Sequence, residues 1–329
     1  MILLTSSLIS LLILSNSIIP SFLPKDGFFS MSAGADRSES GQLSRLNNIK
    51  LPLKGVEFHK EIQELKPVLG LQPPEKLTTS TPEINAQAGV VRDVYSSRAL
   101  WRKKQNKSFP IASITKLMTA LVFLETSPDW ESYYKITEKD RREGGKIYLF
   151  LGERVKVKDL FKTSLVASAN TATAALVHST GLTEEEFARK MNRKAKVMGF
   201  KKTYFKDATG LNSENISTAW EISKFTQVAL EKDRIREAVS LPEYEFETKG
   251  GREKEIKSTD DLLKFFPVEG MELIGGKTGY NEEAGYCFVG GFQNDGNYLI
   301  SVVLGAESKK ERFSLTEELI KWSYKSYKW

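Results

Sequence analysis

Residues 275–292 read GGKTGYNEEAGYCFVGGF, and this stretch decides the fold because it joins two predicted strands through the tripeptide Lys277-Thr278-Gly279. The tripeptide occurs once in the chain. The residues around it favour β structure, which predicts strands over 273–277 and 284–292. We therefore expect the tripeptide at a strand edge, where the Lys277 amine and the Thr278 hydroxyl suit a free carboxylate.

Two more short motifs precede this stretch. Ser113-Ile-Thr-Lys116 lies in FPIASITKLMTAL (109–121), and Ser168-Ala-Asn170 lies in LVASANTATAAL (165–176). Ser113 follows Pro110 and opens an apolar run, which predicts a helix that starts at or just before the serine. One helical turn then places Lys116 on the same face as Ser113.

The sequence also contains a second copy of each of these two motifs. Ser132-Tyr-Tyr-Lys135 is another Ser-x-x-Lys, and Ser213-Glu-Asn215 is another Ser-x-Asn. Ser132 lies among aromatic residues after Pro128, with no comparable helix behind it. We interpret both copies as chance occurrences in a chain rich in lysine and serine.

The residue types of the three motifs suit nucleophilic catalysis by a serine. A serine hydroxyl needs a base, and a lysine serves when burial and a neighbouring cation lower its pKa. We expect Lys116 to be the base of Ser113 and Lys277 to be the neighbouring cation. Ser168 can relay a proton to the leaving group. The Asn170 amide can bond the substrate backbone and the catalytic lysine.

The same stretch offers an oxyanion hole, because the backbone N–H of Tyr280 can pair with that of Ser113. The predicted site therefore has two parts. The expected catalytic residues are Ser113, Lys116, Ser168 and Asn170, and the expected substrate-binding residues are Lys277, Thr278, Gly279 and Tyr280.

Ser-x-x-Lys, Ser-x-Asn and Lys-Thr-Gly, in this order, form the signature of serine enzymes that react with D-alanyl peptides and penicillins. From about Ala86 to the C-terminus, the chain resembles the low-molecular-mass penicillin-binding proteins of the serine D-alanyl-D-alanine carboxypeptidase family. Further landmarks of that family are matched at 187–192, 207–211 and 217–219.

The chain departs from the family pattern at a few positions. Thr171 stands where an aspartate commonly follows the asparagine, Glu221 replaces a usual aspartate, and Asn281 replaces a common threonine. Residues 258–263 depart from an asparagine-rich pattern. None of these positions is the nucleophile or its base, so we expect them to affect rate and specificity more than reaction type.

The order of the predicted elements indicates an α+β domain. Strands are expected over 88–95 and 99–101, and again over 244–248, 273–277, 284–292 and 298–305. Helices lie between them, near 184–197 and 219–230, so the first and last strands should share one antiparallel sheet. The resemblance implies a β-lactamase/transpeptidase-like fold: a five-stranded antiparallel sheet flanked by helices, plus a helical subdomain.

Charge and the scarcity of histidine and cysteine limit the possible functions. The net charge of +6 suits work beside acidic envelope polymers, whereas the basic residues are interleaved with acids and form no nucleic-acid-binding motif. Cys287 is the single cysteine, expected in a buried strand, so no intrachain disulfide can form. His59 and His178 are too few for a zinc peptidase site, and His178 is expected to be a structural helix-end residue. We expect no metal, no cofactor and no nucleic-acid partner.

The N-terminal segment indicates export. Residues 2–19 are apolar apart from Ser, Thr and Asn, and Ala33-Gly34-Ala35 resembles a signal-peptidase site. We expect a signal peptide or membrane anchor over 1–35, a polar extension or linker over 36–85, and the catalytic domain over 86–329. The protein should work at the extracytoplasmic face of the membrane, in the periplasm or in the cell wall. The C-terminal tail should pack on the sheet, so that any membrane tether is N-terminal.

The resemblance implies a carboxypeptidase that removes the terminal D-alanine of peptidoglycan stem peptides through an acyl-serine, with β-lactam antibiotics as covalent inhibitors. An endopeptidase acting on cross-links would use the same residues. A β-lactamase is a further alternative, although the Glu-x-x-Leu-Asn run typical of class A enzymes is missing. Retention of all three motifs argues against a catalytically silent envelope-binding protein.

Overall fold

The structure is a computed structural model that describes residues 73–78 and 80–329. These residues belong to one compact unit, Pro73–Trp329. The expected signal or anchor segment, its possible cleavage site and most of the expected extension lie outside the described residues.

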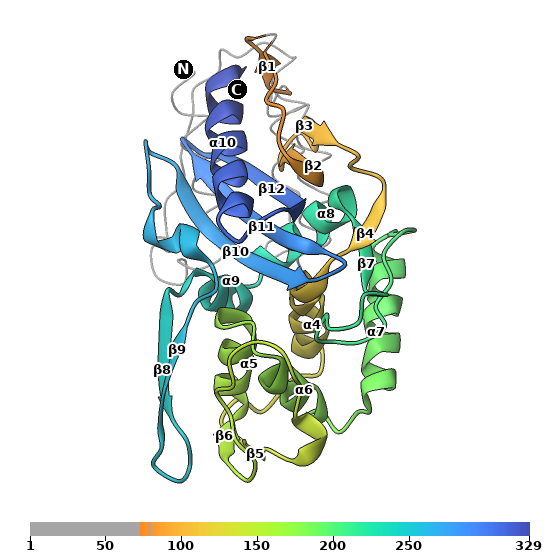
Figure 1. Ribbon diagram of the computed structural model, residues 1–329, viewed down its shortest axis with the longest axis vertical. Coiled ribbons are helices and arrows are strands. Elements are labelled where there is room, and N and C mark those ends of the chain that lie inside the picture. The colour runs from red at the N-terminus through yellow and green to blue at the C-terminus, as the bar shows by residue number, and fades with distance from the viewer. Residues whose placement is uncertain (1–72, 79) are drawn as a thin grey trace, which may run out of the picture. The chain divides into compact units, whose positions relative to one another are not determined.

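The centre of the unit is a five-stranded antiparallel sheet with the strand order β10-β11-β12-β2-β3. The first expected strand does pair with the last one, since Val90 of β2 lies opposite Val302 of β12. Figure 1 shows the sheet crossed by the C-terminal helix α10. This arrangement confirms the predicted α+β fold. The strands are β2 (Ala86–Asp93), β3 (Ala99–Lys103), β10 (Glu272–Asn281), β11 (Gly285–Asn294) and β12 (Asn297–Ala306).

Helices cover both faces of this sheet, which explains why its central strands are almost continuously apolar. Side chains alternate between the two faces of a strand. Ile300 and Val302 of β12 therefore pack with α8 (Ala219–Leu230), whereas Leu299 and Val303 pack with α10 (Glu311–Ser326). Helix α9 (Asp233–Ser240) lies beside β10.

The C-terminal tail packs against the sheet, as the sequence predicted. Leu315, Leu319 and Ile320 of α10 are buried in the apolar layer on this face. The chain then ends in β13 (Tyr327–Lys328), which pairs with β1 (Glu75–Lys76). Residues 75–76 thus belong to the same unit as the sheet.

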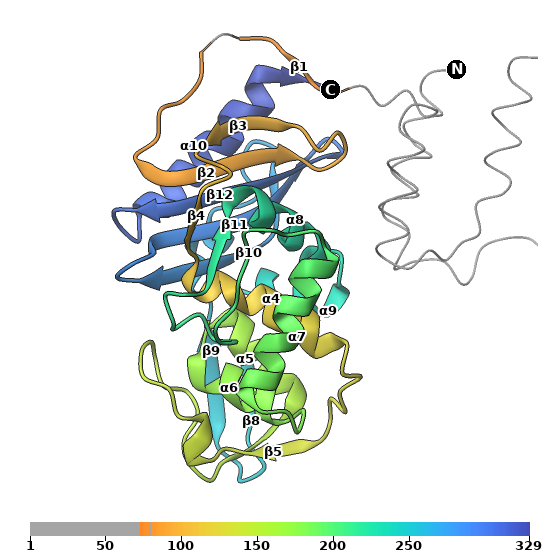
Figure 2. The same ribbon diagram turned by 90° about the vertical axis from the view of Figure 1, so that its right-hand side faces the viewer.

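The remaining helices form a second group at the other end of the unit (Figure 2). Helix α4 lies at its centre and is buried from Thr115 to Phe123. The helix begins with the 3₁₀ turn η1, where the sequence predicted a helix start. The group comprises η1 (Ala112–Ile114), α4 (Thr115–Leu124), α5 (Val157–Val166), α6 (Asn170–His178) and α7 (Glu184–Val197).

Short two-stranded sheets complete the unit. The strand expected over 244–248 forms as β8, but its partner is β9 in a separate hairpin. Pairings of only a few residues carry little periodic signal, which is why most of these elements were not predicted. The sheets are β4 (Ser108–Pro110) with β7 (Ile216–Thr218), β5 (Tyr133–Lys135) with β6 (Arg154–Lys156), and β8 (Glu243–Glu247) with β9 (Glu253–Lys257). Two 3₁₀ turns, η2 (Glu138–Asp140) and η3 (Asp261–Lys264), lie in connections.

Within residues 73–78 and 80–329, no helix has the length and apolar character needed to cross a membrane.

Candidate active site

Ser113 lies in η1, directly before the buried helix α4. The preceding residue, Ala112, has a left-handed backbone with φ +45°, a conformation that residues other than glycine rarely adopt. Two glycines make room for this turn. A Cβ on Gly210 would lie 2.0 Å from the Ala112 carbonyl oxygen, and one on Gly279 would lie 2.8 Å from the Ile111 carbonyl oxygen. The backbone at Ser113 is therefore packed closely between the turn that contains Gly210 and strand β10.

Lys116 follows one turn later and is completely buried. Its Nζ atom lies 2.8 Å from Ser113 Oγ and 2.8 Å from Asn170 Oδ1, and it donates to the Thr209 carbonyl oxygen at 2.6 Å. Three acceptors match the three directions in which this nitrogen can bond. The structure thus joins three predicted site residues in one hydrogen-bonded group.

Ser168 and Asn170 lie where α5 gives way to α6. Ser168 has a left-handed backbone with φ +57°, and such strain in a non-glycine residue often marks functional sites. Its hydroxyl accepts a hydrogen bond from Lys277 Nζ at 2.7 Å. Asn170 is the first residue of α6. Ser168 and Lys277 therefore form a second pair beside the Ser113 group.

Lys277, Thr278 and Gly279 lie in β10, one of the two edge strands of the main sheet. Lys277 Nζ also donates to the Thr278 carbonyl oxygen at 3.1 Å. The Thr278 hydroxyl lies 2.6 Å from that of Thr259. Tyr280 follows, half-exposed, with its ring tilted by 30° against that of Tyr286 and the ring centroids 4.3 Å apart. The expected strand-edge position of the tripeptide is thus found.

Burial dominates the electrostatics of both lysines. It lowers the pKa of Lys116 to about 7, against the opposing effect of the Asp207 carboxylate. Burial also lowers the pKa of Lys277 well below its usual value, and the charges of Lys116 and Arg312 lower it further. The sequence predicts that burial and the charge of Lys277 together lower the Lys116 pKa, and burial is the lowering cause that the structure gives. Two ammonium groups are disfavoured in this site.

The turn at 207–211 has a role at the site that the sequence did not reveal, although the turn matches a family landmark. Asp207 organises it, since its carboxylate accepts the backbone N–H groups of Thr209, Gly210 and Asn212 at 2.6, 2.7 and 2.8 Å. The turn presents the Thr209 carbonyl to Lys116. A run of Asp, Thr and Gly is a turn signal, but its partner could not be read from the sequence.

The residues of the second motif copies make no hydrogen bond to the side chains of Ser113 or Lys116 among those that the structure describes. The Ser132 hydroxyl donates to the Asp129 carbonyl at 2.7 Å, and Lys135 is exposed on β5. Asn215 has a structural role that we did not predict. It is buried, donates to Thr115 Oγ1 at 3.2 Å and accepts the Lys206 backbone N–H at 2.6 Å.

Cys287 and His178 both have structural positions in the fold. Cys287 is buried in β11, and burial raises the pKa of its thiol to about 11. His178 ends α6 and contacts the Asp140 carboxylate, as expected for a helix-end residue. In the part of the chain that the structure describes, no group of three or more His, Cys, Asp and Glu residues could hold a metal ion.

A family profile and several known proteins match the sequence over most of the described unit. The profile of the D-alanyl-D-alanine carboxypeptidase family, peptidase S11, matches residues 75–308. D-alanyl-D-alanine carboxypeptidase DacF of Bacillus subtilis is 31% identical over 258 residues, which are 76% of this chain and 64% of the relative. A D-alanyl-D-alanine endopeptidase of Haemophilus influenzae is 35% identical over 206 residues, 62% of this chain and 69% of the relative. The chain thus spans about two thirds of the length of these two relatives.

Solved structures agree with the sequence matches. A cysteine-to-asparagine mutant of the Streptomyces K15 DD-transpeptidase superposes with a TM-score of 0.69 at 25% identity, covering 74% of this chain and all of the other. Penicillin-binding protein D2 of Listeria monocytogenes, in its cefotaxime-bound form, gives 0.65 at 30% identity and covers 75% of this chain and all of the other. Fold, motif order and family profile agree: the chain belongs to the D-alanyl-D-alanine carboxypeptidase family, peptidase S11.

Proposed function

We propose that this protein is a serine carboxypeptidase that removes the terminal D-alanine from peptidoglycan stem peptides through an acyl-serine intermediate. One observation carries the proposal: Ser113 Oγ lies 2.8 Å from the Nζ atom of Lys116, a fully buried lysine. Membership of the D-alanyl-D-alanine carboxypeptidase family supplies the substrate class.

The lowered pKa of Lys116, about 7, supports its role as the base. A lysine with this pKa is partly neutral at neutral pH and can take the Ser113 proton. Ser113 Oγ then attacks the carbonyl carbon of the penultimate D-alanine. The backbone N–H groups of Ser113 and Tyr280 are the proposed donors to the developing oxyanion.

Collapse of the tetrahedral intermediate breaks the C–N bond and leaves the acyl group on Ser113 Oγ. Ser168 is the proposed route for the proton that the departing D-alanine nitrogen needs, because its hydroxyl contacts Lys277 Nζ at 2.7 Å and it precedes by two residues Asn170, which contacts Lys116. Water then adds to the acyl ester, the C–O bond breaks, and the Ser113 hydroxyl is restored.

Lys277 and Thr278 are the proposed partners of the substrate's terminal carboxylate. In the free enzyme a proton on Lys277 is disfavoured, because burial and the charge of Lys116 lower its pKa. An arriving carboxylate brings the opposite charge and so favours the ammonium form. Binding of a free C-terminus and protonation of Lys277 should therefore be coupled.

β-Lactams are proposed covalent inhibitors of Ser113. Penicillin-binding protein D2 of Listeria monocytogenes, whose fold this chain shares, is known in cefotaxime-bound and ampicillin-bound forms. A second candidate activity is cleavage of cross-links, favoured by the match to the Haemophilus influenzae endopeptidase. Substrates in the cell wall imply action outside the cytoplasm. Export through residues 1–35, followed by cleavage or anchoring, remains part of this proposal.

Labelling with a fluorescent penicillin tests the proposal. The wild-type chain should form a stable adduct, and Ser113→Ala should form none while keeping its circular dichroism spectrum. Rapid turnover of the drug would indicate a β-lactamase, and absence of labelling a silent binding protein. Product analysis on a defined pentapeptide and on a cross-linked dimer then separates carboxypeptidase from endopeptidase.

A further inference from the structure

The side-chain amide of Asn170 is held in one orientation. Its Oδ1 atom accepts a hydrogen bond from Lys116 Nζ at 2.8 Å. Its Nδ2 atom donates to the carbonyl oxygens of Gly144 at 3.1 Å and Glu143 at 3.4 Å. A flipped amide would turn its NH₂ group toward the lysine and its oxygen toward two carbonyls, losing all three bonds. The carbonyls of residues 143 and 144 therefore decide which end of the amide faces Lys116.

These carbonyls belong to a segment without helix or strand, which follows η2. Gly144 and Gly145 have left-handed backbones, with φ +85° and +77°. Such a segment has no ladder of backbone hydrogen bonds to fix its position, so its side chains must do so.

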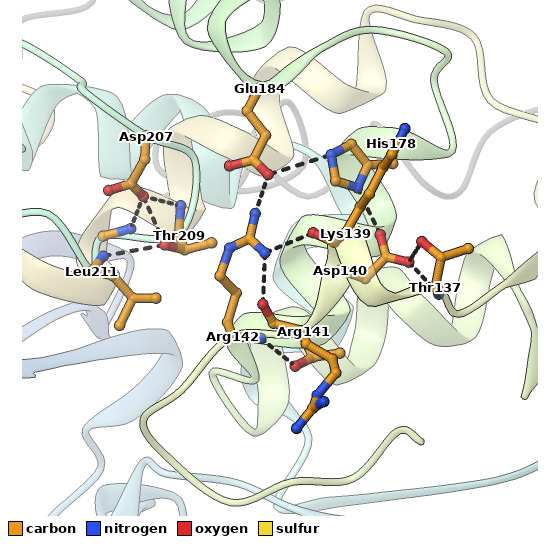
Figure 3. A network of polar contacts seen from close by, with 12 residues as sticks. Thr137, Lys139, Asp140, Arg141, Arg142, His178, Glu184, Asp207, Thr209 and Leu211 are labelled. Atoms are coloured by element: carbon orange, nitrogen blue, oxygen red, sulfur yellow. Dashed lines mark hydrogen bonds and ion pairs between the residues drawn. The ribbon is translucent and has the colours of Figure 1, made fainter. Parts of the chain in front are cut away.

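Arg142 provides these contacts (Figure 3). Its Nη1 atom donates to the carbonyl oxygens of Lys139 and Arg141, both at 2.7 Å, and its Nη2 atom is ion-paired with Glu184. Its backbone N–H donates to Thr171 Oγ1 at 3.2 Å. Thr171, one of the departures from the family pattern, directly follows Asn170. Arg142 thus ties the start of the 143–144 segment to α6 and α7.

Glu184 is itself held in place from the other side. His178 Nε2 lies 3.3 Å from its carboxylate, and His178 Nδ1 lies 2.6 Å from the Asp140 carboxylate. Asp140 is buried, and it accepts the backbone N–H and hydroxyl of Thr137 at 2.7 and 2.8 Å. Contacts therefore run without a break from buried Asp140 through His178 and Glu184 to Arg142 (Figure 3).

We propose that Arg142, braced by Glu184 and His178, is a positioning residue that keeps the Asn170 amide oxygen directed at Lys116. The inference rests on the proposed function and adds to it a residue outside the three motifs. Without the Arg142 side chain, the carbonyls of residues 143 and 144 lose their fixed place. The Asn170 amide then loses its orientation, and acylation of Ser113 slows.

Acylation rate constants of the full chain with a fluorescent penicillin test this role. Arg142→Ala should slow acylation roughly tenfold, the effect of one lost hydrogen bond. Glu184→Ala should act in the same direction, and Glu184→Gln should recover part of the rate because its amide oxygen still accepts from Arg142. The matched control is Arg141→Ala, since the Arg141 side chain is 70% exposed and, among the residues that the structure describes, pairs only with Glu138 on its own turn.

A double-mutant cycle with Asn170→Ala separates positioning from general destabilisation. If Arg142 acts through Asn170, Arg142→Ala should have little further effect on acylation in the Asn170→Ala background. An equal loss in both backgrounds, or a wild-type rate for Arg142→Ala and Glu184→Ala, overturns the inference. Failure of the wild-type chain to label at all would instead overturn the proposed function. Should Arg142→Ala not fold, the Glu184 variants decide on the same criteria.

Discussion

The Nζ atom of Lys116 lies 2.8 Å from the Oγ atom of Ser113, in a site where the lysine has no contact with solvent. Helix α4 explains both facts. The turn that leads from η1 into α4 separates the two residues by three positions, and the burial of α4 from Thr115 to Phe123 takes the amine out of water. A buried ammonium is disfavoured, so the same helix that aligns the two groups also keeps a share of Lys116 neutral near pH 7, the form that can accept a proton.

Replacing Lys116 with alanine should reduce acylation far more than binding. Loss of a general base costs about 10²–10⁴-fold in rate. Stopped-flow measurement of penicillin acylation, with the dissociation constant of the encounter complex fitted separately, gives both quantities. An acylation rate near that of the wild type would mean that Lys277 or a water molecule supplies the base.

Ser113→Ala should abolish labelling, and Ser132→Ala should leave it unchanged. The two serines share the Ser-x-x-Lys spacing, but the Ser132 hydroxyl is bonded to the Asp129 carbonyl and Lys135 is exposed. Mass spectrometry of the labelled peptide identifies the residue. Loss of labelling in Ser132→Ala would overturn the assignment of the nucleophile.

Acylation should decline toward acid with an apparent pKa near 7. The neutral amine of Lys116 is the active form, and its pKa is lowered to about 7 by burial. Below that pH the amine carries a proton and cannot accept one from Ser113, so the rate should fall about tenfold per pH unit. Rates measured with an uncharged acyl donor exclude substrate titration. A pH-independent rate between about pH 5 and 8 would contradict this role.

The sequence predicted the local parts of the site from spacing, and it predicted the contact between Asn170 and Lys116, 54 residues apart, from the chemistry of the motif residues. Ser113 and Lys116 are one turn apart, and the tripeptide at 277–279 lies in a strand that the surrounding β-favouring residues predict. The Thr209 carbonyl, by contrast, reaches Lys116 across 93 residues of chain. The link from Arg142 to Glu184 spans 42 residues and uses side chains that no motif marks. Such contacts depend on packing of distant segments, which periodicity and capping signals do not describe.

Gly210→Ala should both destabilise the protein and slow acylation. The residue has φ +83°, and a Cβ there would lie 2.0 Å from the Ala112 carbonyl oxygen, next to Ser113. Gly199→Ala is the matched control, because Gly199 has φ +76° but a Cβ at that position would have no neighbouring atom within 4 Å. Gly199→Ala should lower the free energy of unfolding by about 1–2 kcal/mol, from backbone strain alone. Denaturant titrations showing equal losses for both variants would mean that the turn can move away from Ser113.

Asp260→Asn should stabilise the protein at pH 8. Asp260 is buried, and its Oδ2 atom has no hydrogen-bond partner among the described residues. Burial raises the pKa of this carboxyl from 3.8 to about 7, although the Leu262 N–H and the charges of Arg312 and Lys277 oppose the shift. Asparagine keeps the shape of the side chain and removes the buried charge.

The sign of the pH dependence follows from this raised pKa. Above the unfolded value of 3.8 the folded state holds the proton more tightly, so the contribution of Asp260 to wild-type stability falls as the pH rises toward about 7. The Asn variant lacks this titration, and its stability advantage over the wild type should therefore grow from about pH 4 to pH 7 and then level off.

Asp261→Asn is the control with the opposite sign. Although burial opposes it, the ammonium groups of Lys264 and Lys309 lower the Asp261 pKa, so its loss should destabilise slightly at pH 7. Parallel stability curves for wild type and Asp260→Asn would show that Asp260 is not held protonated.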